Sequence, residues 1–393
     1  MDFAMKNSDY KDISPFPFGM YFHIPFCLTR CIYCNFFTRD DMVPFLGTYV
    51  DSLCEEIKLT IKKITPNISH CQSIYFGGGT PSLLSVKQVQ QVLDTIRNLY
   101  KFTETVEITM ECNPQDLNTE NVSGFMAAGV NRLSIGCQSF DTILLQSLSR
   151  RHTAEECHTA LKLSNKIGFK NISIDLIFGI PGQTTALWER DLNTTEHYSP
   201  EHVSVYSLTV EPGTPLYNLS RKGLITLPSE SEYADMFLLA DEYLRLNGYE
   251  HYEISNYAKQ GFHSRHNSAY WYGLPYLGIG AGAHSFINNI RSWNVKDIKD
   301  YISHISNKYF PIDDIEELTP EQKFMETVML SLRTEQGLDI TKLTDQYRER
   351  IERIIESLLK DSEEKIVEIN NKIITIPHKK WVIADEIIAQ LVK

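Results

Sequence analysis

Three cysteines lie close together near the start of this 393-residue chain, at Cys27, Cys31 and Cys34. Their spacing is Cys-x-x-x-Cys-x-x-Cys, so three thiolates within eight residues could hold one iron–sulfur cluster from a single loop. If that cluster contains four irons, three protein ligands leave one iron open to an outside ligand, like the vacant position of a catalytic metal site. The sequence therefore predicts a site-differentiated 4Fe–4S cluster.

A zinc site is the alternative use of the same thiols. It would need a fourth cysteine or histidine, and zinc-binding cysteines usually come as two separated Cys-x-x-Cys pairs. His23 could supply the fourth ligand, so the zinc interpretation stays open at this point. The other cysteines are scattered through strand-like and helix-like runs and are most simply small buried hydrophobic residues. They are Cys54, Cys71, Cys112, Cys137 and Cys157.

The elements that must position this site alternate along the first three-quarters of the chain. Short β-rich runs alternate with longer runs of helical periodicity, which is typical of parallel βα units closed or partly closed into a barrel. The expected strands are Met20–Ile24, Ser73–Phe76, Val106–Glu111, Arg132–Cys137, Ile172–Phe178 and His202–Val210. The expected helices are Tyr49–Lys63, Val86–Tyr100, Thr119–Ala128, Ala154–Ile167 and Thr185–His197.

Polar residues or glycines come just after several of these strands. Examples are Gly77–Gly79, Glu111, Gln138 and Asp175. Because the carboxyl ends of parallel strands form the active face of such folds, we expect these residues to converge. Any one of them could instead simply cap a strand or begin a turn.

A different pattern fills the end of the chain. Helical segments at Glu321–Leu332 and Arg348–Leu359 precede two alternating strands and a short closing helix at Ile383–Leu391. The predicted fold class is therefore α/β: a partial, open TIM-like βα barrel over residues 1–300, with a small C-terminal α+β winged-helix-like domain over residues 301–393.

Composition restricts the cellular setting and the partners. The formal net charge of −12 disfavours nucleic acid as a partner, because such a surface repels phosphate backbones. Met1–Asp12 has no apolar core and predicts no signal peptide, and no run approaches the roughly 18 apolar residues of a transmembrane helix. We therefore expect a cytoplasmic protein, in which eight cysteines are reduced thiols or metal ligands.

The cysteine spacing resembles the hallmark of the radical S-adenosylmethionine (SAM) superfamily, and further motifs follow in order. Gly77-Gly78-Gly79-Thr80-Pro81 resembles the superfamily's glycine motif. Finer matches point to the oxygen-independent coproporphyrinogen III oxidase-like branch. They are Tyr21–Cys27, Glu111–Pro114, Gly136–Phe140, Leu148–His152, Asp175–Gly182 and Glu211–Pro215. The resemblance covers roughly residues 18–286, and the tail fits more loosely.

This resemblance implies a set of SAM contacts. The implied residues are Tyr21, Gly78, Gly79, Thr80, Glu111, Gln138, Arg150 and Asp175. Each type suits the task, since carboxylates accept hydrogen bonds from hydroxyl or ammonium groups and arginine can clamp a carboxylate with its planar fork. Tyr21 could equally be a packed strand residue, Arg150 a surface charge and Asp175 a strand-end cap.

Two departures separate this chain from the true oxidases. Phe36 stands where those enzymes carry a fourth cysteine, and only 26 residues precede Cys27, where they have a longer N-terminal extension. Both departures are shared with HemW-type heme chaperones, and His266-Asn267-Ser268-Ala269-Tyr270-Trp271 resembles their HNxxYW motif. His266 is thus a candidate heme ligand, although a histidine near aromatic residues is often only structural.

The resemblance therefore implies a 4Fe–4S protein that binds SAM and heme and passes heme to an acceptor hemoprotein. A reductant protein such as flavodoxin or ferredoxin is implied as a partner, and a homodimer or peripheral membrane association stays open. The alternative is an oxygen-independent coproporphyrinogen III oxidase, which oxidatively decarboxylates propionates. Whether the protein is an enzyme is left open by the sequence.

Overall fold

The computed structural model describes residues 17–64, 70–100, 102–361 and 366–392. The expectation about Met1–Asp12 falls on residues outside these ranges. Within the described ranges, no helix combines the length and the apolar character needed to cross a bilayer.

Parallel strands form the centre of a 12-stranded sheet. The first six strands pair as consecutive parallel neighbours, and β9 adds in parallel to the other side of β1. These strands are β1 (Pro17–Ile24), β2 (His70–Gly78), β3 (Phe102–Cys112), β4 (Arg132–Gln138), β5 (Ile172–Phe178), β6 (His202–Ser207) and β9 (Tyr276–Ile279). Parallel neighbours require crossover connections, which here are helices.

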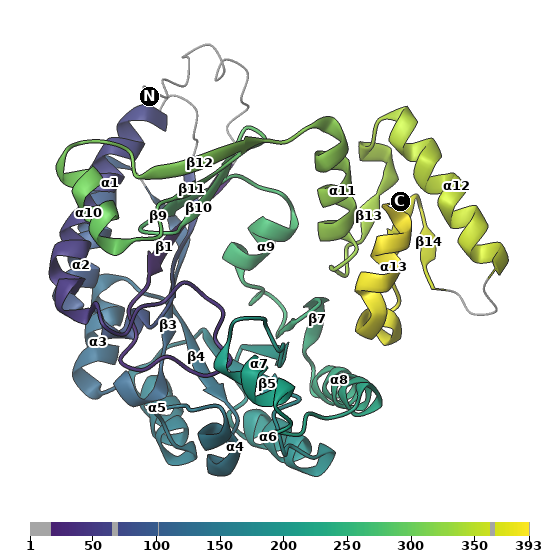
Figure 1. Cartoon of the computed structure of the whole chain (residues 1–393), viewed down its shortest axis with the longest axis horizontal. Helices are drawn as coiled ribbons and strands as arrows, with labels where there is room; N and C mark the ends of the chain where they lie inside the picture. Colours follow the sequence, from purple (N-terminus) through teal and green to yellow (C-terminus); the bar gives the residue numbers. More distant parts are fainter. Residues whose placement is uncertain (1–16, 65–69, 101, 362–365, 393) are drawn as a thin grey trace.

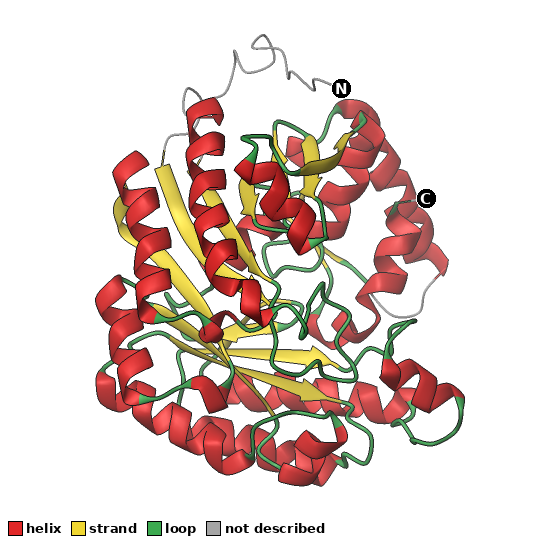
Figure 2. Ribbon diagram, turned by 60° about the vertical axis from the view of Figure 1, so that its left-hand side comes forward, coloured by secondary structure: helices red, strands yellow, loops and turns green. Residues whose placement is uncertain are grey.

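The crossover helices cover the outer face of the curved sheet (Figures 1 and 2). They are α1 (Leu46–Ile64), α2 (Val86–Leu99), α3 (Thr119–Ala128), α4 (Thr142–Ser147), α5 (Ala154–Ile167) and α6 (Thr185–Tyr198). Ser85 begins α2 and Thr153 begins α5, each in a capping box with the side chain three residues later. Helices α3 and α5 have the predicted bounds.

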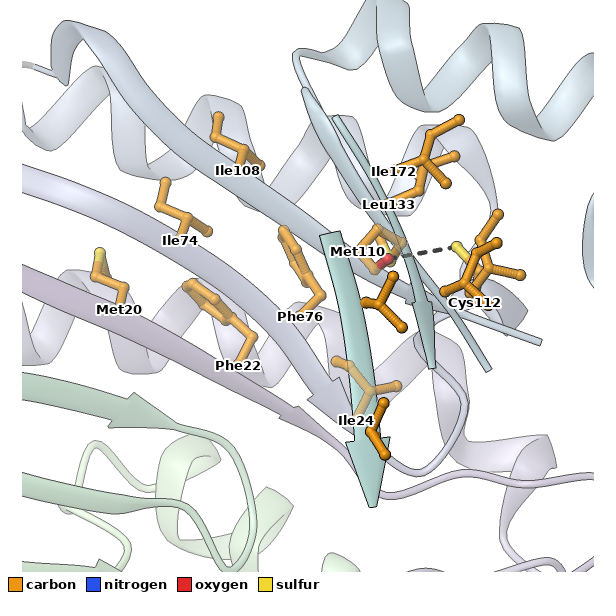
Figure 3. Close-up of a cluster of buried hydrophobic side chains, with 14 of the residues drawn as sticks. Met20, Phe22, Ile24, Ile74, Phe76, Ile108, Met110, Cys112, Leu133 and Ile172 are labelled. Atoms are coloured by element: carbon orange, nitrogen blue, oxygen red, sulfur yellow. Dashed lines mark hydrogen bonds between the residues drawn. The ribbon is translucent and has the colours of Figure 1, made fainter. Parts of the chain in front are cut away.

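Side chains alternate between the two faces of each parallel strand. Apolar residues such as Phe22, Phe76 and Met110 pack towards the helices and form the core that Figure 3 shows. Their neighbours on the strands, among them Tyr75 and Glu111, face the inside of the barrel, where they meet one another. The alternation follows from the period of two in a strand. It gives the barrel an apolar outer layer and a polar interior.

Antiparallel strands flank the parallel centre on both sides. They are β8 (Asn256–Ala258) and β7 (Glu250–Glu253) beyond β6, and β10 (His284–Ile287), β11 (Ile290–Asn294) and β12 (Ile312–Glu317) beyond β9. The sheet runs from β12 to β7, and these two end strands do not pair with each other over their described residues. The prediction of an open, partial barrel is thereby confirmed.

Further helices occupy the connections to these flanking strands. They are α7 (Pro215–Arg221) and α8 (Glu230–Leu246) after β6, α9 (Arg265–Trp271) between β8 and β9, and α10 (Ile298–Ser306) between β11 and β12. Helix α9 packs against β1 and β2 and lies within the curve of the sheet (Figure 1).

The C-terminal segment builds a small unit with its own three-stranded sheet. It contains α11 (Pro320–Ser331), β13 (Leu338–Asp339), the 3₁₀ turn η5 (Ile340–Lys342), α12 (Asp345–Asp361), β14 (Glu368–Asn370), β15 (Ile373–Thr375), the 3₁₀ helix η6 (His378–Ile383) and α13 (Ala384–Leu391). The β14–β15 hairpin beside helices gives the predicted winged-helix-like α+β arrangement.

The division at residues 300 and 301 stays a prediction. We propose that the boundary lies after Glu317 instead. Helix α10 packs against α1, and β12 hydrogen-bonds to β11 up to Glu317, so both belong to the barrel.

One buried carboxylate joins α1 to this extension of the sheet. Glu56 accepts hydrogen bonds from Tyr301 Oη (2.5 Å), Asn294 Nδ2 (2.7 Å) and Gly280 N (2.8 Å). We expect Glu56→Ala to lower the free energy of unfolding by about 3 kcal/mol or more, because each buried donor left without an acceptor costs about 1–3 kcal/mol. Urea unfolding followed by circular dichroism measures this loss.

The neighbouring Glu55 supplies the control. It forms solvent-exposed ion pairs with Lys58 and Lys308, so Glu55→Ala should change stability by about 1 kcal/mol at most. Equal unfolding midpoints for the two variants would contradict this account of Glu56.

Candidate functional site

The three cysteines lie on a loop that leaves the end of β1. Backbone hydrogen bonds close the base of the loop, from Cys27 N to Arg39 O (3.2 Å) and from Arg39 N to Pro25 O (2.6 Å). Cys34 N donates to Cys31 O at 3.2 Å within the loop. Cys27 is buried, whereas Cys31 and Cys34 are partly exposed. The backbone of one short segment thus holds all three thiols at one end of the barrel.

A glycine loop after β2 packs directly against the start of the cysteine loop. Gly79 N donates to Ile24 O at 2.9 Å and Thr80 N to Phe26 O at 2.8 Å. A Cβ on Gly79 would lie 2.7–2.9 Å from backbone atoms of Ile24 and Phe26, so this approach requires glycine. The Thr80 hydroxyl also donates to Cys27 Sγ at 3.4 Å. The two motifs therefore form one structural unit.

A cavity of about 520 Å³ opens at this end of the barrel. The three cysteines line it together with most of the residues expected from sequence. Those expected residues are Gly78, Gly79, Thr80, Glu111, Gln138, Arg150 and Asp175. Tyr21, the remaining implied SAM contact, is not among its lining residues, and neither is His266, the candidate heme ligand. Convergence at the carboxyl ends of the strands explains why residues so far apart in sequence meet here.

The three thiols do not meet the spacing of a single-ion site. One zinc ion with bonds of about 2.3 Å would hold its sulfurs within about 4.6 Å of one another. Among the described residues, only one set of three ligand atoms lies within 4.8 Å of one another. It is elsewhere in the structure and includes none of these cysteines. Burial raises the pKa of the Cys27 and Cys34 thiols, so an electropositive group is needed to keep them as thiolates.

His23 does not complete a zinc site in this arrangement. Its Nε2 lies 2.9 Å from Phe37 O and its Nδ1 lies 3.0 Å from Tyr21 Oη, so both ring nitrogens are hydrogen-bonded. Burial lowers the pKa of His23 to about 4, which keeps the ring neutral. His23 therefore supports the base of the site and offers it no free ligand atom.

Arg150 brings a positive charge to the thiols. Its Nη1 lies 3.7 Å from Cys31 Sγ, and its Nη2 donates to Gly136 O at 3.0 Å. The Nε atom is buried and has no hydrogen-bond partner. An arginine fixed in this way can balance negative charge at the thiolates and still offer a donor to a bound carboxylate.

Two buried carboxylates face the interior of the barrel. Glu111 accepts from Tyr75 Oη (2.8 Å) and Gly78 N (3.1 Å), and burial raises its pKa to about 7. Asp175 accepts from the Ser134 hydroxyl at 2.8 Å, and burial raises its pKa as well. The prediction that these two carboxylates follow their strands is wrong. Glu111 is the penultimate residue of β3, and Asp175 lies in the middle of β5 and reaches the cavity through the inward alternation.

Several cavity residues were missed in the sequence. They include Tyr33, Tyr75, Ser134 and Tyr206. The signal that could have found most of them is the alternation along β2, β4 and β6, where polar residues occupy every second position.

His266 and Tyr21 lie deeper in the barrel, behind Tyr75. The His266 ring stacks on Tyr75 with centroids 4.8 Å apart, and Tyr21 stacks on the same tyrosine. His266 Nδ1 lies 3.0 Å from Ser73 Oγ, and Nε2 lies 3.0 Å from Tyr270 Oη. Both ring nitrogens of His266 are therefore hydrogen-bonded, and the residue is almost fully buried, at 2% exposure.

Comparison with known proteins agrees with this arrangement. The model of the Radical SAM superfamily matches residues 21–194. The heme chaperone HemW of Bacillus subtilis (strain 168) is 37% identical over 370 residues, which cover 93% of this chain and 97% of that protein. The chain belongs to the HemW family of radical SAM proteins. HemW of Mycobacterium tuberculosis (strain ATCC 25618 / H37Rv) is 34% identical over 88% of this chain and 89% of its own length.

The solved structures extend the likeness to the fold. Coproporphyrinogen III oxidase (HemN) from Escherichia coli, a radical SAM enzyme, superposes with a TM-score of 0.82 at 24% identity, covering 96% of this chain and 90% of that one. This likeness confirms the predicted fold class, while the family-model match and the HemW relatives confirm the predicted superfamily and branch. Membership of the radical SAM superfamily implies a 4Fe–4S cluster and SAM as cofactors, and the thiols and cavity described above suit them.

Proposed function

We propose that this protein is a heme chaperone, which binds heme and transfers it to an acceptor hemoprotein. The observation that carries the proposal is the alignment with HemW of Bacillus subtilis (strain 168), which covers 93% of this chain and 97% of that protein. Phe36 supports it, because this side chain is 69% exposed beside the cysteines where the oxidases place a fourth thiol. Transfer of heme to a hemoprotein does not require the oxidative decarboxylation of a porphyrinogen.

We further propose that Cys27, Cys31 and Cys34 ligate the 4Fe–4S cluster and that the cavity residues bind SAM. The bound cluster would supply one electron at the sulfonium of SAM. This chain's residues would do the rest: Arg150 balances charge at the thiolates, the glycine loop places its backbone against the ligand, and Glu111 attracts the cationic end. Tyr21 would act through its neighbour Tyr75, since it does not line the cavity.

The raised pKa of Glu111 makes SAM binding pH-dependent. Below about pH 7 the carboxyl group is protonated and neutral, and above it the carboxylate attracts the positive charges of SAM. Affinity should therefore rise roughly tenfold between pH 6 and pH 8 in the cluster-loaded protein, as expected for one ionisation near the midpoint of that range. Anaerobic titration calorimetry measures it.

The variant Glu111→Gln should bind more weakly at pH 8 and lose most of this pH dependence. The matched control is Glu120→Gln on the exposed surface of α3, which should keep both the affinity and its pH dependence. Because the amino group of SAM itself titrates near pH 8, the difference between the two variants is the decisive quantity. An identical pH dependence in both would remove Glu111 from the site.

For heme, we propose His266 as the ligand to iron. Both ring nitrogens are hydrogen-bonded in this structure. Nε2 would therefore have to lose its hydrogen bond with the Tyr270 hydroxyl before it could bind iron. Burial lowers the pKa of His266 to about 3, so the imidazole is neutral, which is the form that binds metal. The arrangement predicts that removing the Tyr270 hydroxyl strengthens heme binding.

The test is heme binding and transfer under anaerobic conditions. His266→Ala should retain heme at least tenfold more weakly than the unaltered protein, with the same iron content of the cluster, whereas Tyr270→Phe should bind heme more tightly than the unaltered protein. Transfer is followed by the Soret band of an added apo-hemoprotein. Unchanged heme affinity in His266→Ala would assign His266 a purely structural role. The reductant partner, a homodimer, membrane association and a cytoplasmic location all stay predictions.

A further inference from the structure

A second group of metal-ligating side chains lies far along the chain from the cysteines. Asp241 of α8, His251 of β7 and His378 of η6 bring one ligand atom each to within 4.8 Å of one another. Over the described ranges, this is the only group of three or more histidine, cysteine or acidic residues that meets this spacing. Two residues come from the barrel and one from the C-terminal unit.

Only one of the two contacts that Asp241 makes with these histidines is a hydrogen bond. His251 Nδ1 lies 2.8 Å from Asp241 Oδ1, a normal hydrogen-bond distance. His378 Nδ1 lies 3.9 Å from the same oxygen, which is too long for a hydrogen bond. That nitrogen is buried and has no hydrogen-bond partner. A buried imidazole nitrogen aimed at a carboxylate across such a gap leaves space for a bridging ion.

The surroundings suit a metal ligand set. The side chains of His251 and Asp241 are 0% and 7% exposed, so neither is an ordinary surface group. Aromatic rings hold the imidazoles in place, with Tyr257 stacked on His251 at 3.9 Å and Trp381 against both histidines at 4.4 and 4.5 Å. Ile254 O lies 3.4 Å from His251 Nε2 and can orient the ring from behind, as carbonyls do around metal-bound histidines.

The charge around the group also allows a cation. Burial lowers the pKa of both histidines, so they are neutral and able to ligate at pH 7. Arg245 is a cation in contact with the group, and its Nη1 lies 3.4 Å from Asp241 Oδ2. Its side chain is half exposed and can turn towards solvent when an ion binds.

We propose that Asp241, His251 and His378 bind one zinc ion, which fastens the C-terminal unit to the barrel. Two imidazoles and one carboxylate match the three-ligand sets of catalytic zinc sites, in which water takes the fourth position. The ion would join α8, β7 and η6, and η6 already packs on α8. This site is independent of the cysteine loop and of the proposed heme transfer.

Zinc titration of the cluster-loaded protein against a chromogenic chelator tests the proposal. The unaltered protein should bind one zinc per chain, and His378→Gln and Asp241→Asn should bind it at least tenfold more weakly. His304→Gln is the matched control, because His304 lies partly exposed on α10, outside the proposed site, and should leave zinc binding unchanged. The cysteines are identical in all four proteins, so zinc at those thiols cannot produce the difference.

Cobalt supplies a second measurement that does not depend on stability. Co²⁺ in the unaltered protein should show visible d–d bands without thiolate charge-transfer bands, and His378→Gln should lack the d–d bands. Iron content and circular dichroism must match between the proteins, which separates loss of the ligand from loss of the fold. Equal zinc affinity in the unaltered protein and in His378→Gln, or thiolate bands alone, would overturn the proposal and leave these residues as a hydrogen-bonded contact.

Discussion

Cys31→Ser is expected to abolish the brown absorbance of the anaerobically reconstituted protein while leaving the fold intact. Cys31 is partly exposed at the cavity and lies 3.7 Å from Arg150, so its sulfur is placed to be a ligand and supports little of the core. Two remaining thiolates cannot hold a cluster whose open iron already lacks a protein ligand. Chemical analysis should show that most of the iron and most of the sulfide are lost, while the circular dichroism spectrum is unchanged.

A buried cysteine outside the loop provides the control. Cys54 lies on α1 with its sulfur 3.9 Å from Gln91 O, and it is not among the residues that line the cavity. Cys54→Ser should keep full iron and sulfide content at a modest cost in stability. Normal iron and sulfide in Cys31→Ser would remove Cys31 from the ligand set.

Gly79→Ala is expected to damage the site nearly as much as Cys31→Ser does, although it removes no ligand. The added methyl group would lie 2.7 Å from Phe26 O and 2.8 Å from Ile24 O, and backbone atoms cannot yield as a flexible side chain can. The glycine loop must then move away from the residue preceding Cys27. We expect SAM affinity to fall at least tenfold and cluster content to fall with it, because overpacking of this kind costs roughly 1–3 kcal/mol.

Gly47→Ala is the matched control, since the same methyl group there meets nothing within 4 Å. Gly47 lies in the first turn of α1, where alanine favours the helix, so this variant should be at least as stable as the unaltered protein. Anaerobic calorimetry with SAM and iron analysis compare the two. Unchanged SAM binding in Gly79→Ala would mean that the close approach of the two loops does not matter for the site.

The local parts of the site could be predicted from sequence because their geometry is local. Three thiols within eight residues must share one loop whatever the rest of the chain does. The strands and helices of the barrel could be predicted equally well, since α3, α5 and β5 have bounds set by their own caps and periodicity.

Features that depend on contacts between segments distant in the sequence could not be predicted. Nothing near His266 in sequence indicates that Ser73 bonds to its ring, because the two are 193 residues apart. The same holds for His378, which meets Asp241 only once the C-terminal unit has packed on the barrel. Asp175 shows a third limit: it was placed at a strand end, although its role follows from its inward position in the middle of β5.

The most direct test of the central claim is one anaerobic experiment on cluster-loaded protein with SAM and a reductant, supplied in parallel with coproporphyrinogen III and with heme plus an apo-hemoprotein. The account predicts that the porphyrinogen is recovered unchanged and that the acceptor gains the heme Soret band. Formation of protoporphyrinogen IX without heme transfer would contradict it and assign the chain to the oxidases.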